Sequence, residues 1–340
     1  MTLFILTTVF IVLLVLGALH YAVERWFDTL SLRKLTSHNA ITEPLPKASV
    51  VLFFKNKLSH SETVKELLAQ NYAGAYHIWL VGQEGVESTN DPKIHHYITE
   101  FHSAETELDI LKSIAAGGDS EILLSLYDGI SIYPEWLSSM AQEFEPGIEV
   151  VRAPLMYSNV NQRSWVKESL ILYYNKLNLS EAARIARQKN IFIPTENSGF
   201  LKSFLMSNTQ PIFNKPGRIQ YTIDPNALVR RIGNARALLN RYQLCTVQKS
   251  TPLLMRCYLI ALTFSTFLCF FSVKLLLTAI ISLILKSIMD ILFIIRGMKL
   301  IGTQPSWKSI VVFELFHAPL ITFCSLLSFY RFLRMKNKVS

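Results

Sequence analysis

Cysteine is scarce in this sequence, and its few cysteines lack the spacing of a metal or redox site. The 340 residues include only Cys245, Cys257, Cys269 and Cys324, and no two of these form a C-x-x-C pair. All four lie in or near apolar stretches, which is typical of free, reduced thiols with a structural role. The sequence therefore indicates neither a zinc site nor a disulfide framework.

Acidic residues are also few. Asp and Glu together number 25 against 34 Lys and Arg, which gives a formal net charge of +9. In a membrane protein such an excess serves cytoplasmic loops and anionic lipid headgroups more often than nucleic acid. The sequence also lacks a basic stripe interleaved with aromatic residues, the pattern of single-strand binders. We therefore expect a membrane surface as a partner, and no nucleic acid.

Long apolar runs are what the sequence does have. Half of its residues are hydrophobic, and the mean hydropathy is +0.28. Residues 2–23 form one continuous run, long enough to cross a bilayer. A secretory signal peptide is the alternative, but no basic segment precedes the run and no small-residue cleavage site follows it. We therefore predict a transmembrane anchor at 1–23. The positive-inside rule then places the chain from residue 24 onward in the cytoplasm.

The chain turns apolar again near its C-terminus, so we predict a membrane region at 251–340 with two or three spans and a basic tail. The candidate spans lie near 257–273, 275–295 and 309–330. Three spans would leave the basic tail outside, against the positive-inside bias. One of the three segments is therefore expected to be interfacial or re-entrant.

Two of these apolar segments carry charges. Glu314, His317 and Pro319 favour 309–330 as the interfacial or re-entrant segment. The alternative is 275–295, where Lys286 and Asp290 lie four residues apart on one helical face. Charges inside a membrane usually pair with each other or face protein, so we expect these two to form a structural ion pair.

Between a polar linker at 24–46 and this region, residues 47–250 carry the pattern of an α/β domain. A helix-like segment at 61–70 separates apolar runs, which lie at 48–54, 77–81 and 121–126. Continuous runs of this length are typical of parallel strands covered on both faces. Because ligands bind outside the carboxyl ends of such strands, site residues are expected just after Phe54, Val81 and Leu126.

Several short motifs in this domain, taken in order, resemble those of family 2 glycosyltransferases. Ser49-Val-Val-Leu-Phe-Phe-Lys-Asn56 is similar to S-V-V-I-P-x-R-N-E, so Lys55 and Asn56 match the family's R-N pair. Gln70 and Tyr72 match L-x-x-Q-x-Y-P. Downstream, Asn197 with Lys202 resembles N-x-x-x-x-[RK]. The segment from Ile223 to Arg230 or Arg231 resembles E-D-x-x-L-x-x-R, with one residue more before Leu228.

The resemblance implies a Rossmann-like GT-A domain with a mixed, mostly parallel sheet in the cytosol, and transmembrane helices at both ends. It implies an inverting, hexosyltransferase-type reaction from a nucleotide-sugar donor to a lipid-linked or cell-envelope glycan acceptor. A cytosolic donor site suits a bacterial inner membrane. A carboxylate must take the acceptor's hydroxyl proton, and a divalent cation such as Mg²⁺ or Mn²⁺, or basic groups, must neutralise the departing diphosphate.

The resemblance assigns the general base to Asp224, the second acid of the E-D motif. The alternative is a helix N-cap, since Pro225 follows at what would be the first helical position. It assigns a metal or diphosphate contact to Asp128. Here the family's D-x-D is reduced to Tyr127-Asp128-Gly129, and a turn-forming Asp-Gly is the alternative.

Other family acids are absent as well. Where the family has D-D-x-S, this chain has Gly82-Gln-Glu-Gly85, so Gln83 or Glu84 would contact the nucleobase, with a plain glycine turn as the alternative. Arg152 is expected on the solvated surface, with a contact to phosphate or lipid headgroups as the alternative. The missing acids favour a competing hypothesis, a catalytically inactive scaffold or partner subunit in envelope polysaccharide assembly, with another protein as its partner.

Overall fold

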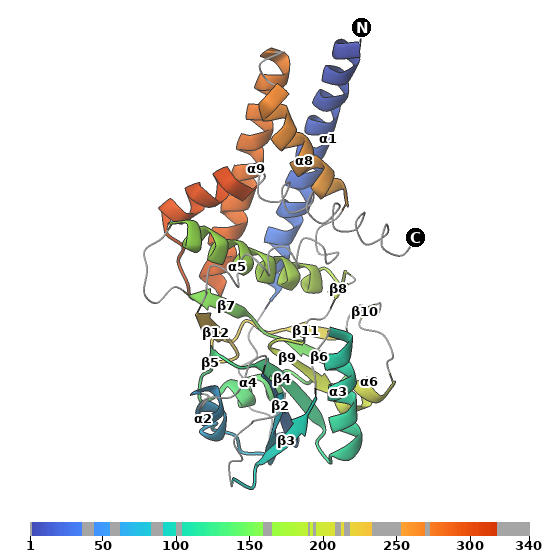
Figure 1. Cartoon of the computed structure of the whole chain (residues 1–340), viewed down its shortest axis with the longest axis vertical. Helices are drawn as coiled ribbons and strands as arrows, with labels where there is room; N and C mark the ends of the chain where they lie inside the picture. The colour runs from blue at the N-terminus through green and yellow to red at the C-terminus, as the bar shows by residue number, and fades with distance from the viewer. Residues whose placement is uncertain are drawn as a thin grey trace.

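The fold has a sheet-based body at one end and a group of apolar helices at the other (Figure 1). The computed structural model describes residues 2–35, 44–54, 62–82, 91–99, 104–158, 165–189, 191–192, 195–207, 212–213, 218–232, 253–268 and 273–317. Between the two ends lies α5 (Trp165–Ala186), a long helix that packs against elements of both (Figure 1). This helix therefore connects the sheet to the apolar helices.

The main sheet has seven strands in the order β11-β6-β9-β4-β1-β2-β3. Their bounds are β1 Ala48–Phe53, β2 Tyr76–Gly82, β3 Ile94–Ile98, β4 Ile122–Tyr127, β6 Val150–Arg152, β9 Ser198–Leu201 and β11 Ile219–Tyr221. Only β9 runs antiparallel to its neighbours, β4 and β6. The α/β fold with a mixed, mostly parallel sheet is thus confirmed.

The central strands are the ones that the sequence predicts. All six residues of β1 and all six of β4 are buried, as expected of continuous apolar runs covered on both faces. The predicted strand at 77–81 is β2, and the predicted helix at 61–70 is α2 (Glu62–Leu68). Sequence reasoning missed β3, an edge strand that is only partly buried and carries two histidines, so that it shows no apolar run.

Short helices flank the sheet, α2 and α4 (Trp136–Gln142) on one side and α3 (Ala104–Gly117) and α6 (Lys202–Ser207) on the other (Figure 1). A second sheet joins β5 (Ile130–Ser131), β12 (Val229–Ile232) and β7 (Leu155–Ser158), with β12 in the middle. A third pairs β8 (Ile191–Phe192) with β10 (Ile212–Phe213). The second sheet matters for the site because it brings β12 beside the chain that follows β4.

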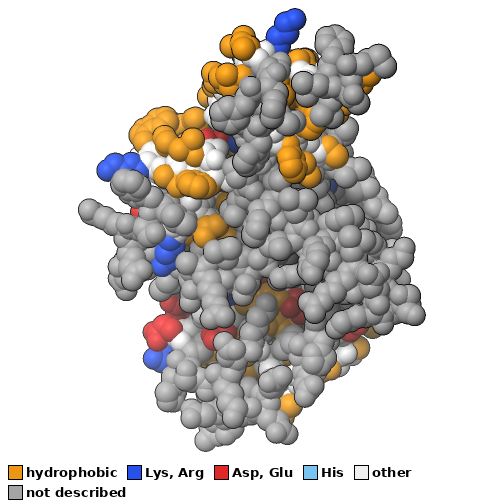
Figure 2. All heavy atoms as spheres, turned by 45° about the horizontal axis from the view of Figure 1, so that its top comes forward, with side chains coloured by type: hydrophobic (Ala, Val, Ile, Leu, Met, Phe, Trp, Pro, Cys, Tyr) orange, Lys and Arg blue, Asp and Glu red, His pale blue; other side chains and the backbone are white. Residues whose placement is uncertain are grey.

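The apolar end consists of α1 (Thr2–Ser31), α8 (Leu253–Leu268) and α9 (Val273–Leu300), which pack against one another. By length and composition, two helices of the described residues are able to cross a membrane, Thr7–Lys34 and Val273–Leu300. Their outer faces expose large apolar side chains, such as Leu16 and Ile281, and Figure 2 shows apolar side chains gathered at this end. A further helix covers 307–317, while the rest of the predicted segment 309–330 lies outside the described residues.

A buried group of charges joins these helices. Lys286 Nζ lies 3.0 Å from Asp290 Oδ2 within α9, so the expected ion pair is confirmed. It is part of a larger cluster, because Lys176 of α5 lies 2.7 Å from the same carboxylate and Glu314 lies 2.5 Å from Lys286. On α1, Tyr21 donates to Asp290 as well. Since buried charges must be paired, this cluster holds α5 in one position on the apolar helices.

Candidate functional site

Several polar side chains meet at one edge of the main sheet. Because β1, β4, β6 and β11 are mutually parallel, their carboxyl ends lie at the same edge, where antiparallel β9 begins. Asp128 follows β4, Arg152 ends β6, Asp224 follows β11 by three residues, and Glu196 precedes β9 by two. In open α/β sheets this carboxyl edge is where ligands bind.

Four of the predicted donor-side residues, Lys55, Asn56, Gln83 and Glu84, lie outside the described residues. The strands that they follow are neighbours, with Phe53 paired to Val81 in the parallel register. The Phe54 N–H continues the pairing by donating to the Val81 carbonyl at 2.8 Å. The ends of β1 and β2 therefore lie side by side, next to the end of β4.

Asp128 and Gly129 form a bend at the end of β4, as the alternative from the sequence had it. The Asp128 N–H donates to the Phe53 carbonyl at 3.0 Å, and Gly129 has φ +76°, a left-handed conformation that favours glycine. The chain then enters β5. Asp128 is half-buried and is the one carboxylate in the Tyr127-Asp128-Gly129 segment.

Tyr127, which the sequence resemblance places at the first acidic position of D-x-D, is buried and hydrogen-bonded to a neighbouring acid. Its hydroxyl donates to one oxygen of Glu107 on α3, and the Thr195 hydroxyl donates to the other. Burial, and next the nearby Glu107 charge, raise the pKa of Tyr127 well above its usual value. Sequence reasoning missed Glu107. The available signal was its spacing, because Ile110, Leu111 and Ile114 follow it by three, four and seven residues and put it on the buried face of α3.

These residues do not fit a metal site of the D-x-D type. Such a site needs carboxylate oxygens, yet this segment offers Asp128 alone, between a tyrosine and a glycine. Across the described part of the chain, no three His, Cys, Asp or Glu side chains are grouped so that they could hold a metal ion.

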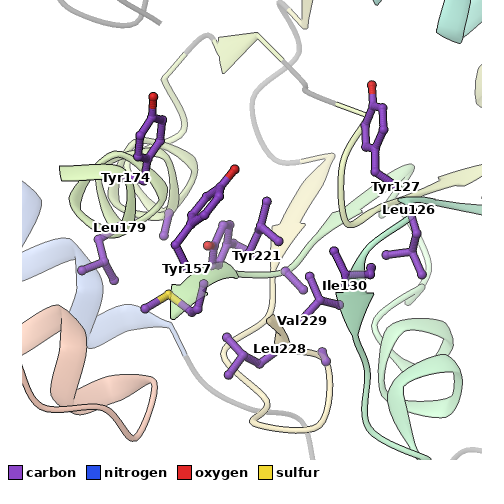
Figure 3. Packing of buried hydrophobic residues seen from close by; sticks show 14 of the residues in the cluster. Leu126, Tyr127, Ile130, Tyr157, Tyr174, Leu179, Tyr221, Leu228 and Val229 are labelled. Atoms are coloured by element: carbon purple, nitrogen blue, oxygen red, sulfur yellow. The ribbon is translucent and has the colours of Figure 1, made fainter. Parts of the chain in front are cut away.

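An arginine of β12, Arg231, lies beside this bend. The backbone of β12 pairs with β5, with Arg230 opposite Ser131 and Arg231 opposite Ile130. Arg231 donates to the Asp128 carbonyl at 3.2 Å, forms an ion pair with Glu196 and lies with its guanidinium 5.9 Å from the centre of the Tyr127 ring. The segments involved are seen in Figure 3, where Tyr127, Ile130 and Val229 mark β4, β5 and β12.

Asp224 begins a turn, so the alternative of a helix N-cap is wrong. Its Oδ1 accepts the Asn226 N–H at 2.9 Å, and its own N–H donates to the Thr222 hydroxyl at 3.1 Å. After this turn the chain enters β12, because the Val229 N–H donates to the Pro154 carbonyl where pairing with β7 begins. Tertiary strand pairing thus overrides a local helix signal. The Asp224 carboxylate is half-buried at the carboxyl edge.

Asn197 organises the backbone around this edge. It is fully buried with φ +52°, and its amide donates to the carbonyls of Pro154 (2.9 Å) and Ala227 (3.2 Å). Its carbonyl oxygen accepts the indole N–H of Trp136 at 3.0 Å. The asparagine of the N-x-x-x-x-[RK] motif therefore fixes the chain before β9, the turn after Asp224 and helix α4 relative to one another.

Arg152 is buried, so its predicted place on the solvated surface is wrong. Its guanidinium donates twice to Glu181 of α5, at 2.9 and 3.0 Å, and once to the Ser198 hydroxyl at 2.7 Å. The available signal was its position at the end of an apolar run, Val150-Val-Arg152, where the strand is still covered by a helix. This ion pair ties the carboxyl edge to α5.

Comparison with known proteins adds to this geometry. No family model and no curated protein matches the sequence. Among solved structures, the chain resembles the mannosyltransferase PcManGT from Pyrobaculum calidifontis, determined in complex with GDP-Man and Mn²⁺. Identity is 12%, the match covers 93% of this chain and 99% of that chain, and the TM-score is 0.50. This chain has a GT-A glycosyltransferase fold.

A second solved structure, of a mycobacterial protein, matches 59% of this chain and 73% of its own at 12% identity and a TM-score of 0.33, a likeness too slight to bear on the fold. At 12% identity, the similarity to PcManGT concerns the fold and not the site residues. Within the GT-A fold of this chain, the described edge carries Asp128, Arg152, Glu196, Asp224 and Arg231.

Proposed function

We propose that this protein is a membrane-bound, inverting glycosyltransferase that moves a hexose from a nucleotide-sugar donor to a lipid-linked or cell-envelope glycan. The observation that carries the proposal is the GT-A fold across 93% of the chain, with a half-buried carboxylate, Asp224, at the carboxyl edge. PcManGT was determined with GDP-Man, which makes GDP-mannose the first donor to test.

Asp224 is the proposed general base. Its turn holds the carboxylate by one backbone hydrogen bond, to Asn226, at the edge where a donor lies in open α/β sheets. There it would take the proton of the acceptor hydroxyl as that oxygen attacks the anomeric carbon and the nucleoside diphosphate leaves on the opposite side. Lys55, Asn56, Gln83 and Glu84 are proposed on the donor side of the site from their places after β1 and β2.

The membrane part of the proposal rests on the apolar helices. Thr7–Lys34 and Val273–Leu300 are long enough to cross a bilayer, and α5 connects them to the sheet through Arg152–Glu181 on one side and Lys176–Asp290 on the other. An acceptor carried on a lipid requires a transferase domain held at the membrane surface. This arrangement supports such an acceptor, and a cytoplasmic site at a bacterial inner membrane is part of the proposal.

The test is a transferase assay on the full-length, detergent-solubilised protein, with GDP-mannose and other nucleotide sugars, added membrane lipid, and released nucleoside diphosphate as the readout. Asp224→Asn keeps the acceptor of the turn but removes the base, so we expect a rate lower by about 10²- to 10⁴-fold with unchanged donor binding. Asp91→Asn is the matched control, because Asp91 Oδ1 accepts the Lys93 N–H at 2.9 Å in an equivalent turn beside β3.

An Asp224→Asn protein with the wild-type rate would remove Asp224 from the mechanism. Failure of the wild-type protein to bind or consume any nucleotide sugar would overturn the enzyme and favour the competing scaffold or partner subunit. The Tyr127-Asp128-Gly129 segment is the observation that favours this second candidate. Its own test is purification with an active transferase from the native membrane.

A further inference from the structure

The helix at 307–317 has an exposed apolar side. Trp307, Val311 and Leu315 follow one another at intervals of four residues and are 66%, 56% and 63% exposed, and Phe316 beside Leu315 is 59% exposed. Residues four apart lie on one side of an α-helix, so these four side chains form a single apolar stripe, which we call the outer stripe. Because the outer stripe faces away from the protein, it requires an apolar surrounding other than the core.

The inner side of the same helix packs on α5. Near the start of the helix, Ser309 Oγ donates to Glu168 Oε2 of α5 at 2.5 Å, and further along the centre of the Phe313 ring lies 4.9 Å from Lys176 Nζ of α5. The helix at 307–317 therefore runs alongside α5, which lies across α1 and α9 (Figure 1). It does not run along α9, as a further membrane span beside α9 would.

The helix lies at the level where α1 changes from apolar to charged. Residues 2–23 contain no Asp, Glu, Lys or Arg, and the first charged residues of α1 are Glu24 and Arg25. Arg25 Nε lies 3.6 Å from Asp290 Oδ1 of α9. Asp290 pairs with Lys286, and Lys286 Nζ lies 2.5 Å from Glu314 Oε2 on the helix at 307–317. These contacts place the helix at the boundary between the apolar and the polar part of the molecule.

Aromatic and basic side chains lie near this boundary. Trp26 and Phe27 of α1 are 53% and 49% exposed. From residue 294 to residue 312 the charged residues are all basic: Arg296, Lys299 and Lys308. Tryptophan is enriched where a membrane meets water, and basic residues are attracted by anionic lipid headgroups. A lipid surface therefore fits both the outer stripe and its neighbours.

We propose that the helix at 307–317 is interfacial: it lies in the plane of the bilayer surface, with the outer stripe between the lipid headgroups and the upper acyl chains. The inference rests on the membrane part of the proposed function and adds how the sheet is held at that surface. The helix supports α5 from the membrane side, and α5 reaches the carboxyl edge through the Arg152–Glu181 ion pair.

The experiment measures the depth of tryptophan side chains in the full-length protein, reconstituted into phosphatidylcholine–phosphatidylglycerol vesicles. Lipids brominated at defined acyl positions quench tryptophan fluorescence according to depth. The parent protein carries Trp26→Phe and Trp307→Phe, and its remaining signal is subtracted. A single tryptophan is then supplied by restoring Trp307, by Val311→Trp or by Leu315→Trp.

We expect strong quenching by lipids brominated near the headgroup, and one shallow depth for all three positions. A helix crossing the bilayer at about 1.5 Å per residue would instead separate positions 307 and 315 by about 12 Å in depth. The matched control uses Leu277 and Ile288, which are exposed on α9. Leu277→Trp and Ile288→Trp in the same parent should differ in depth by up to about 16 Å.

Each other outcome has a definite meaning. Depths that increase from 307 to 315 would overturn the inference and leave the proposed function standing, because the helix would then cross the bilayer. Quenching on α9 but at none of the three helix positions would overturn it too, since protein or water would then cover the outer stripe. Absence of quenching on α9 as well would overturn the membrane part of both proposals, while the transferase assay still decides the enzyme. If one tryptophan variant fails to fold, the other two positions still give a depth difference.

Discussion

Glu107 is a buried carboxylate that accepts hydrogen bonds from two hydroxyls, those of Tyr127 and Thr195. This arrangement disfavours ionisation of Tyr127, because a buried phenolate would lie next to the Glu107 carboxylate. At the scale of single residues, Tyr127, which the sequence resemblance matches to a metal-binding acid, is part of the core. Among the described residues of this edge, Asp128, Asp224 and Arg231 keep some exposure to solvent.

The raised pKa of Tyr127 predicts alkaline instability. In the unfolded chain a tyrosine ionises near pH ~10, whereas the folded protein keeps Tyr127 protonated. Above that pH the folded state therefore binds more protons than the unfolded state, and the free energy of unfolding falls as the pH rises. We expect Tyr127→Phe to flatten this loss, while lowering stability at pH ~8 by about 1–3 kcal/mol because Glu107 loses a donor.

The measurement is the Tm of the detergent-solubilised protein as a function of pH between ~8 and ~11, around the usual tyrosine pKa. Tyr97→Phe on β3 is the control, since this side chain is only half-buried and should leave the slope unchanged. Equal slopes for wild type and Tyr127→Phe would contradict the role given to Tyr127.

At the scale of elements, α5 is held to α9 by close packing as well as by charge. Gly297 of α9 faces Leu179 of α5, and a Cβ added at Gly297 would lie 2.5 Å from Leu179 Cδ1. Leu179 is itself buried, so it has little room to move. The absence of a side chain at Gly297 is therefore what lets the two helices approach.

Gly297→Ala is expected to destabilise the protein by about 1–3 kcal/mol through overpacking. Leu179→Ala alone opens a cavity and costs about 2–4 kcal/mol, but in the double variant the added methyl finds space. The summed losses of the two single variants should thus exceed the loss of the double variant, as measured by Tm in detergent. Gly117→Ala in α3, with open space at its Cβ, is the control. Strict additivity would show that the two helices do not meet as described.

At the scale of the whole molecule, the exposed apolar side chains gather on the helices that lie beyond α5 (Figures 1 and 2). A bilayer around α1 and α9 would cover them. We expect the protein to remain with the membrane after alkaline carbonate washing and to need detergent for release.

One substitution distinguishes a lipid-facing helix from a helix exposed to water. Ile281 on α9 is 65% exposed, and Ile98 on β3 is 67% exposed. If α9 faces lipid, Ile281→Asp costs about 2.5–3.5 kcal/mol of insertion and lowers the yield of membrane-integrated protein, whereas Ile98→Asp does not. The readout is the amount of each variant in the washed membrane fraction. Equal yields, with Ile281→Asp protein in the soluble fraction, would argue against a membrane-spanning α9.

Much of the fold was predictable because its signals are local. The runs at β1, β2 and β4 are continuous and apolar, and the long apolar helices stand out by composition alone. The placement of Asp128 at the carboxyl end of β4 followed from the same reasoning. The edge strand β3 was missed because a half-covered strand with two histidines has no such signal.

The sequence by itself determined which segments are buried strands, which helices are apolar enough for a membrane, and that the acids of a metal site are missing. Only the tertiary structure decided that Asp224 begins a turn instead of a helix, that Arg152 is buried against Glu181, and that Arg231 lies beside Asp128. The physical reason is the range of the interactions. A burial pattern is visible in a run of neighbouring residues, whereas the strand pairing and ion pairs of this edge join residues that are distant in the chain.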